Sequence, residues 1–138
     1  MKKIISILAC SVALSGCADP AERSAEYLES GKALYEQDKL KKAKLEFRNA
    51  LQIDNKLADA YYHLGLIAEK NKNWEGMYKN LSRVVNLSPE NSDARLKLAK
   101  LYLLSGENDK ASTEVEFVLK QVPDNVDAIA LKGAVLLK

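Results

Sequence analysis

The residues of this chain whose types could do chemistry are few, and they do not cluster. Both cysteines, Cys10 and Cys17, lie in or beside an apolar segment at the start, so the rest of the chain has neither a disulfide framework nor a thiolate metal site. His63 is the only histidine, and with no second ligand or nucleophile beside it we expect a surface or packing residue. The sequence shows no phosphate loop, nucleophile elbow or paired carboxylates, so we expect no catalysis, no metal and no cofactor.

The sulfur of Cys17 is the exception, because the residues before it have the layout of an export signal. Lys2 and Lys3 precede an apolar run over residues 4–14. This run is too short for a transmembrane helix, which needs about 20 residues, and it fits the apolar region of a secretory signal. Residues 1–16 are therefore predicted to be a signal peptide.

The end of this segment, Leu14-Ser15-Gly16-Cys17, resembles the lipobox of bacterial lipoproteins. In that family a peptidase cuts before a cysteine that carries a diacylglycerol, so the resemblance implies that Cys17 is lipidated and attaches the chain to a membrane. The next residue is Ala18 rather than Asp, which by the same resemblance implies the outer membrane of a Gram-negative bacterium, on its periplasmic face. An ordinary signal peptide that happens to contain a cysteine is the alternative.

The chain beyond this signal is electrically neutral. The whole sequence has 21 basic and 19 acidic residues, and removal of Lys2 and Lys3 leaves equal numbers. Nucleic-acid binding requires a basic surface, so we do not expect nucleic acid as a partner. The strongest local charge is a run of lysines that either touches anionic headgroups or forms a solvated outer face: Lys39, Lys41, Lys42 and Lys44.

From residue 20 onward the apolar residues recur at helical spacing, and the pattern repeats every 34 residues. Four repeats begin at Ser24, Ala58, Ser92 and Val126. Small residues stand where a first helix would cross its neighbour: Gly31, Gly65, Ala99 and Gly133. The pattern resembles the tetratricopeptide repeat, for example in the second repeat with Tyr61, Leu64, Gly65, Leu81 and Pro89.

This resemblance implies an all-α solenoid of antiparallel helix pairs, with three full repeats and one helix of a fourth. We predict helices over residues 20–37, 40–53, 58–71, 74–87, 92–105, 108–121 and 126–137. A lipidated tether is expected over residues 17–23, followed by repeats over 24–57, 58–91, 92–125 and 126–138.

Local signals mark the ends of these helices. Asn91 and Asn125 are predicted to cap the helices that follow them. The family keeps a left-handed glycine in the turn within each repeat, as Gly106 does here. Asp38 and Lys72 replace that glycine in the first two repeats, at a cost of about 1 kcal/mol each.

Two further expectations concern apolar residues. Trp74 begins the second helix of repeat two, where the family keeps a packing aromatic, so we expect it in the core. The last predicted helix is apolar on nearly all sides, with Asp127, Lys132 and Lys138 as its polar residues. Terminal repeats need a polar outer face, so we expect that further repeats or a partner cover this helix.

In the family, first helices line a concave groove that binds a protein or peptide. Leu28, Tyr62 and Leu96 form a row spaced by one repeat that would hold a peptide through apolar anchors; the alternative is that these side chains only pack between helices. Leu28 and Asp93 stand where a chaperone-type carboxylate clamp requires lysine, so such a clamp is not expected. The resemblance places these residues in the groove: Leu28, Lys32, Tyr35, Tyr62, Leu66, Glu69, Leu96, Lys100 and Leu103.

Taken together, the sequence predicts a membrane-anchored periplasmic scaffold that mediates protein–protein interaction. Residues 47–52 and 58–62 are similar to the tetratricopeptide lipoproteins of PEP-CTERM and exosortase systems, which implies a role in exopolysaccharide export or protein sorting. One alternative is an outer-membrane assembly factor, such as a type IV pilus pilotin or a barrel-assembly lipoprotein. Another is the N-terminal repeat region of a larger enzyme.

Overall fold

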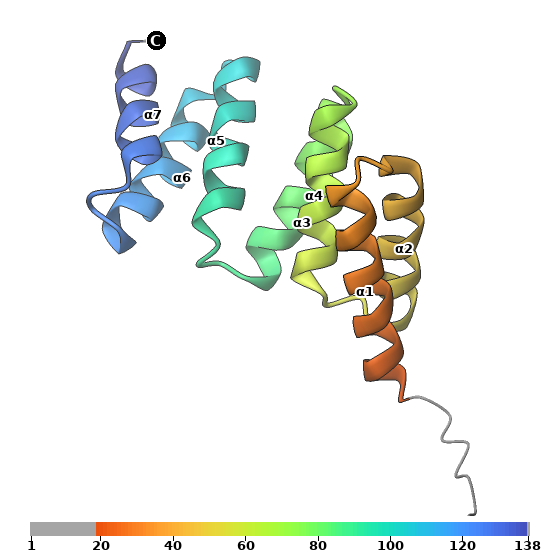
Figure 1. The fold of residues 1–138 in the computed structure, drawn as a ribbon. Helices are drawn as coiled ribbons and strands as arrows, with labels where there is room; N and C mark the ends of the chain where they lie inside the picture. The colour runs from red at the N-terminus through yellow and green to blue at the C-terminus, as the bar shows by residue number, and fades with distance from the viewer. Residues whose placement is uncertain (1–18, 138) are drawn as a thin grey trace, which may run out of the picture.

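The computed structural model describes residues 19–137 and is all-helical over that range (Figure 1). The predictions for the signal peptide and for Cys17 lie outside the described residues. No described helix is both long enough and apolar enough to cross a bilayer. The helices are α1 (Pro20–Glu36), α2 (Leu40–Ile53), α3 (Ala58–Lys70), α4 (Trp74–Leu87), α5 (Ser92–Ser105), α6 (Asn108–Gln121) and α7 (Val126–Leu136).

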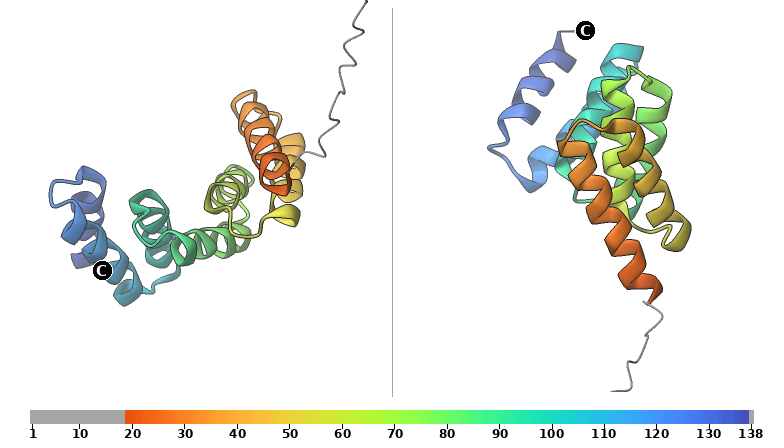
Figure 2. Two further views of the ribbon diagram at one scale, coloured as in Figure 1. Left: turned by 90° about the horizontal axis from the view of Figure 1, so that it is seen from below. Right: turned by 45° about the vertical axis from the view of Figure 1, so that its right-hand side comes forward.

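Consecutive helices pair, and the pairs stack into an arc (Figure 2). The pairs are α1 with α2, α3 with α4, and α5 with α6, and the second helix of each pair packs on the first helix of the next. The predicted all-α class and solenoid arrangement are therefore confirmed. The predicted helix bounds are also confirmed, to within one residue at each end.

Local capping chemistry explains several of these bounds. The side chains of Asn91 and Asn125 each accept a hydrogen bond of 2.9 Å from a backbone N–H in the first helical turn, as predicted. Asp38 and Lys72 adopt left-handed backbone with φ of 55° and 54°, and Gly106 does so with φ of 80°. The predicted turn geometry is thus confirmed, including at the two positions that lack glycine.

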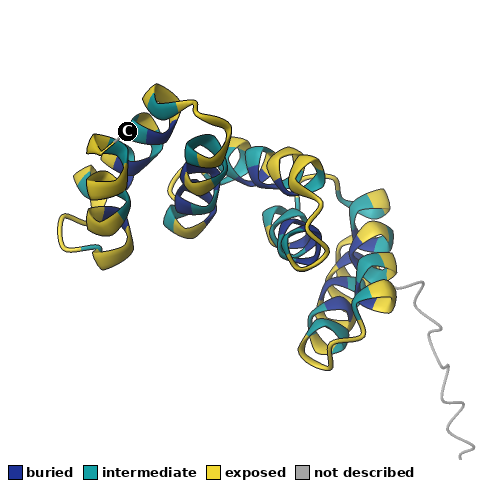
Figure 3. Cartoon of the chain, turned by 90° about the horizontal axis from the view of Figure 1, so that it is seen from above, coloured by how far each residue is buried: buried dark blue, intermediate teal, exposed yellow. Residues whose placement is uncertain are grey.

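The core lies between the two helices of each pair and along the seams between pairs (Figure 3). Phe47 and Leu81 are fully buried second-helix residues, and each lies against a first-helix glycine. A β-carbon added at Gly31 would lie 2.6 Å from the Phe47 ring, and one at Gly65 would lie 3.0 Å from Leu81. These two glycines permit the close approach expected of them, whereas an added β-carbon at Gly133 would meet nothing within 4 Å.

Two expectations about apolar residues have different outcomes. The prediction that Trp74 is a core residue is wrong, since it is 50% exposed. It stands at the first position of α4, on the side toward α5 rather than toward α3, where it borders a surface hollow. The apolar surface of α7 is exposed at Val126, Ile129 and Leu136, and its coverage by further repeats or by a partner stays a prediction.

Candidate functional site

The first helices of adjacent repeats are joined by polar side chains. Between α1 and α3, Lys32 Nζ lies 3.0 Å from a carboxylate oxygen of Asp59, and 3.0 Å from Glu29 on its own helix. Burial opposes the charge on Lys32, but the hydrogen bonds to Asp59 and Glu29 outweigh it, so the pKa of this lysine is raised. Lys32 therefore stays charged and connects the first repeat to the second.

The junction between α3 and α5 has two such links. The Tyr62 hydroxyl donates to the Asp93 carboxylate, 31 residues further along the chain. Lys97 Nζ lies 2.9 Å from Glu69 Oε2. Because each link spans one repeat boundary, these side chains help to fix the angle between repeats two and three.

His63 is a packing residue at the centre of an aromatic cluster. Its ring stacks on Phe47 with centroids 5.0 Å apart, and meets Tyr35 and Tyr62 edge to face. Its Nδ1 lies 2.8 Å from the backbone carbonyl of Asp59. The packing role expected for this histidine is confirmed.

The nine predicted groove residues divide into three groups. Leu28 and Leu96 are 9% and 4% exposed and lie in the core, so they offer a ligand little surface. Lys32, Tyr35, Tyr62 and Glu69 are partly buried and contact neighbouring residues, as the packing alternative describes. Leu66 and Leu103 are also partly buried and Lys100 is exposed, and these three side chains take no part in the links just described. That these nine residues bind a ligand stays a prediction.

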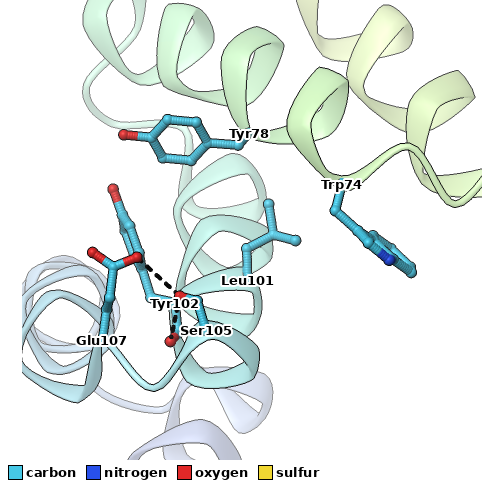
Figure 4. A pocket seen from close by; sticks show the side chains of 6 residues that line it. All are labelled: Trp74, Tyr78, Leu101, Tyr102, Ser105 and Glu107. Carbon is cyan, nitrogen blue, oxygen red and sulfur yellow. Dashed lines mark hydrogen bonds between the residues drawn. The ribbon is translucent and has the colours of Figure 1, made fainter.

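A hollow of about 210 Å³ lies instead between α4 and α5 (Figure 4). Tyr78 and Tyr102 meet edge to face across it, with ring centroids 6.0 Å apart. Trp74 and Leu104 line an adjoining hollow that shares Leu101 and Ser105 with the first. We call this surface the aromatic hollow; its residues are Trp74, Tyr78, Leu101, Tyr102, Leu104, Ser105 and Glu107.

Three large apolar or aromatic side chains of the aromatic hollow are exposed. Trp74 is 50% exposed, Tyr78 44% and Leu104 77%. Tryptophan and tyrosine dominate the binding energy of protein interfaces because their rings bury a large area at little entropic cost. The arrangement is suited to holding one apolar side chain of a partner rather than to a chemical reaction.

The polar rim of the aromatic hollow is internally neutralised. Ser105 Oγ donates to Glu107 at 2.9 Å, and Lys110 forms an ion pair with the same carboxylate. The hydrogen bond from Lys110, followed by that from Ser105, lowers the pKa of Glu107. Burial, followed by the neighbouring Tyr78 hydroxyl, raises the pKa of Tyr102 to about 12. Tyr102 therefore stays an uncharged phenol to a higher pH than an ordinary tyrosine does.

Sequence reasoning missed this hollow and one buried ion pair. Trp74 and Tyr78 are four residues apart and therefore share a helix face. This spacing is the feature of the sequence that could have indicated the hollow. Arg95 gave no signal: it is 9% exposed, its guanidinium lies 3.6 Å from the Phe117 ring centroid, and Nη1 lies 2.5 Å from Glu114. Arg95 Nε also donates to the Pro89 carbonyl at 2.6 Å, which ties the α4–α5 loop to the third repeat.

Family models match most of the described chain. A model described as "TPR repeat" matches residues 31–72, and two described as "Tetratricopeptide repeat" match residues 59–91 and 78–135. Residues 31–135 therefore contain tetratricopeptide repeats. Among curated proteins, the chain is similar to the peroxisomal targeting signal receptor of Candida albicans, with 32% identity over 98 residues. That match covers 71% of this chain but only 16% of the receptor.

Solved tetratricopeptide domains share the fold. The second such domain of human RPAP3, in complex with an HSP70 peptide, is 18% identical with a TM-score of 0.75, and the match covers 87% of this chain and all of that one. The first such domain of Spaghetti, bound to an HSP90 peptide, is 15% identical with a TM-score of 0.75, over 88% and 98% of the two chains. The Arabidopsis OM64 domain is 16% identical with a TM-score of 0.75, over 86% and 98%.

Proposed function

We propose that this protein is a lipid-anchored scaffold of the outer membrane that binds a peptide segment of a partner protein through the aromatic hollow. The observation that carries the proposal is the exposure of Trp74, Tyr78 and Leu104 around two adjoining hollows at a repeat junction. Large exposed apolar patches rimmed by polar groups mark interaction sites. The peptide complexes of similar tetratricopeptide domains support a binding role rather than a catalytic one.

The expected ligand is an extended segment that inserts one large apolar side chain. Because Lys110 already neutralises Glu107, the rim offers no free charge pair to select a strongly charged peptide. The hydroxyls of Tyr78 and Tyr102 interact with each other, and their remaining hydrogen-bonding capacity would orient the backbone or side chain of the ligand. Affinity would therefore come mainly from apolar burial.

Site-specific photo-crosslinking tests this proposal in the intact lipoprotein in its own membrane. A photoreactive residue at position 78 is expected to yield a discrete protein adduct that Trp74→Ala removes. The matched control is position 45 on α2, because Leu45, like Tyr78, is a large exposed apolar residue but lies outside the described hollows. Equal adducts from positions 45 and 78, or an adduct that persists in Trp74→Ala, would contradict the assignment.

The first-helix face is the second candidate surface. Leu66, Lys100 and Leu103 are its accessible predicted residues. Replacing Leu66 and Lys100 with alanine leaves the inter-repeat links intact, so it separates ligand binding from packing. Loss of the adduct in this variant but not in Trp74→Ala would move the binding site to the groove.

The membrane anchor is proposed at Cys17. Because α1 begins at Pro20, residues 20–23 of the expected tether are helical. Three residues including Cys17 precede the helix and span about 10 Å when extended. An acylated Cys17 would therefore hold the first repeat close to the membrane surface. Cys17→Ser is expected to abolish incorporation of labelled palmitate; labelling that persists in the variant refutes the anchor.

The pathway served is proposed from sequence similarity alone. The stretches at residues 47–52 and 58–62 favour exopolysaccharide export or protein sorting over pilus or barrel assembly. A deletion strain should then lose secreted polysaccharide or mis-sort exported proteins while retaining pili and outer-membrane barrels. Loss of pili or barrels with normal secretion would favour the assembly-factor alternative.

A further inference from the structure

A second cavity of about 260 Å³, on the other side of α4 from the aromatic hollow, is lined by cations and amides. It lies between α2, α3 and α4. Lys44 and Arg48 line it from α2, and Lys79 from α4. Asn71, Asn73 and Asn80 also line it, whereas none of its lining residues is acidic.

The three cations of this cavity have no partner of their own. Within residues 19–137, Lys44, Arg48 and Lys79 form neither an ion pair nor a side-chain hydrogen bond. Other lysines of the same repeats are paired, such as Lys32 with Asp59 and Lys70 with Asp38. Three unpaired positive charges around one cavity repel one another, and a bound anion would relieve that repulsion.

The amide side chains add fixed donors to the same cavity. Asn73 caps α4 by accepting a hydrogen bond from the Gly76 backbone N–H at 2.9 Å, so its amide nitrogen is not used in the cap. Asn80 donates to the Gly76 carbonyl at 2.7 Å, which holds it in place. A β-carbon at residue 76 would lie 2.8 Å from the Asn73 amide nitrogen. Glycine at this position therefore preserves both the cap and the direction of that donor.

We propose that this cavity binds a phosphate group, as free phosphate or as a phosphate ester. A phosphate offers several acceptor oxygens and more than one negative charge, which matches a guanidinium, two ammonium groups and at least one amide donor better than a single carboxylate does. The cavity also has an apolar wall from Leu64 and Ile67 of α3. That wall would accept the carbon skeleton of a phosphate ester.

With the Cys17 anchor proposed above, the position of the cavity favours a soluble ligand over the headgroups of the bilayer. Asn71 and Asn73 flank the α3–α4 turn, which lies at the end of the helices opposite to the start of α1 (Figure 1). Helix α1 has 17 residues, so this end lies about 25 Å along the helix from Pro20 at 1.5 Å per residue. The phosphate site is independent of the aromatic hollow, and either can be wrong without the other.

Titration with inorganic phosphate at constant ionic strength tests the site, using the full chain with Cys17→Ser and amide NMR detection. Saturable shifts are expected at Gly76 and at the side-chain amides of Asn71 and Asn73. Arg48→Gln should weaken binding about tenfold, as expected for loss of a charge-assisted hydrogen bond. Lys120→Gln removes an exposed cation elsewhere and is the matched control, with an expected change of less than about twofold by the same principle.

Saturation at the cavity with a selective effect of Arg48→Gln supports the site, provided that far-UV circular dichroism shows an unchanged fold. Lys79→Gln on α4 is the second variant, and it should also weaken binding. Non-saturating shifts spread over many lysines, or equal effects of Arg48→Gln and Lys120→Gln, overturn it. Binding to phosphatidylglycerol vesicles without any response to inorganic phosphate would overturn the soluble-ligand assignment.

Discussion

Alanine at three equivalent glycines provides a graded test of how closely the repeats pack. Gly31, Gly65 and Gly133 occupy the same position in the first helices of repeats one, two and four, and repeat three has Ala99 there. At Gly31 the new β-carbon would lie 2.6 and 2.7 Å from two atoms of the Phe47 ring, which is fully buried. At Gly65 it would lie 3.0 Å from the end of the Leu81 side chain, and at Gly133 it would meet nothing within 4 Å.

Two opposing effects set the magnitude. Replacing glycine with alanine inside a helix stabilises it by about 1 kcal/mol, an effect the three sites share in sign. Overpacking a rigid core costs about 1–3 kcal/mol, and the overlap at Gly31 puts it at the upper end. We expect Gly31→Ala to lower the free energy of unfolding by about 2 kcal/mol, since the clash outweighs the helix gain. Gly65→Ala should be nearly neutral, and Gly133→Ala should raise the free energy by up to about 1 kcal/mol.

Urea unfolding followed by far-UV circular dichroism measures the series. From the most stable variant to the least stable, the order should be Gly133→Ala, Gly65→Ala and Gly31→Ala. Adding Phe47→Leu to Gly31→Ala should cost less than Phe47→Leu alone costs the parent chain, because the smaller side chain removes the clash. If Gly31→Ala unfolds at the same urea concentration as Gly133→Ala, the close approach of α1 to Phe47 is refuted.

Three other predictions concern backbone strain, a buried ion pair and a phenol. Lys72→Gly should raise the free energy of unfolding by about 1 kcal/mol, because φ of 54° is strained for lysine. Asp38→Gly should raise it less, because this variant loses the 2.8 Å contact with Lys70. The urea midpoints of the two variants measure the difference. Arg95→Met should cost about 3 kcal/mol because it leaves Glu114 unpaired, and a further Glu114→Leu should recover part of that loss; if the double variant is no better, charge is not the cause. The folded-state pKa of Tyr102 is raised from 10.0 to about 12, so its contribution to stability should be complete below pH 10 and disappear as the pH rises toward 12. The absorbance titration of the parent chain should therefore show one tyrosinate step near pH 12 that the titration of Tyr102→Phe lacks. If the step that the variant lacks lies near pH 10 instead, the burial of Tyr102 is contradicted.

The helices could be predicted because their signals are local. Caps such as Asn91 and Asn125, and turn positions such as Asp38 and Lys72, act within a few residues of where they stand. The 34-residue period then implied that helix hairpins stack on one another, because a lone hairpin buries too little surface to be stable. The same reasoning found the close contacts of Gly31 and Gly65.

The candidate site was less accessible because it depends on rotation of helices about their axes and on the angle between repeats. The family pattern assigned Leu28 and Leu96 to a ligand groove, yet both pack into the core. It assigned Trp74 to the core, yet that ring borders the aromatic hollow. A small rotation of a helix about its axis moves a side chain from the core to the surface. The spacing of apolar residues does not determine that rotation.

The sequence by itself therefore determined the helices, their order, their caps and the repeat that stacks them, because these follow from chemistry within one turn or one period. Only the tertiary structure decided which polar side chains meet across a repeat boundary, such as Tyr62 with Asp93 and Arg95 with Glu114. It also decided that cations from α2 and α4 share one cavity. The physical reason is that these contacts join residues on different helices, and side-chain length and helix orientation together determine whether they are made.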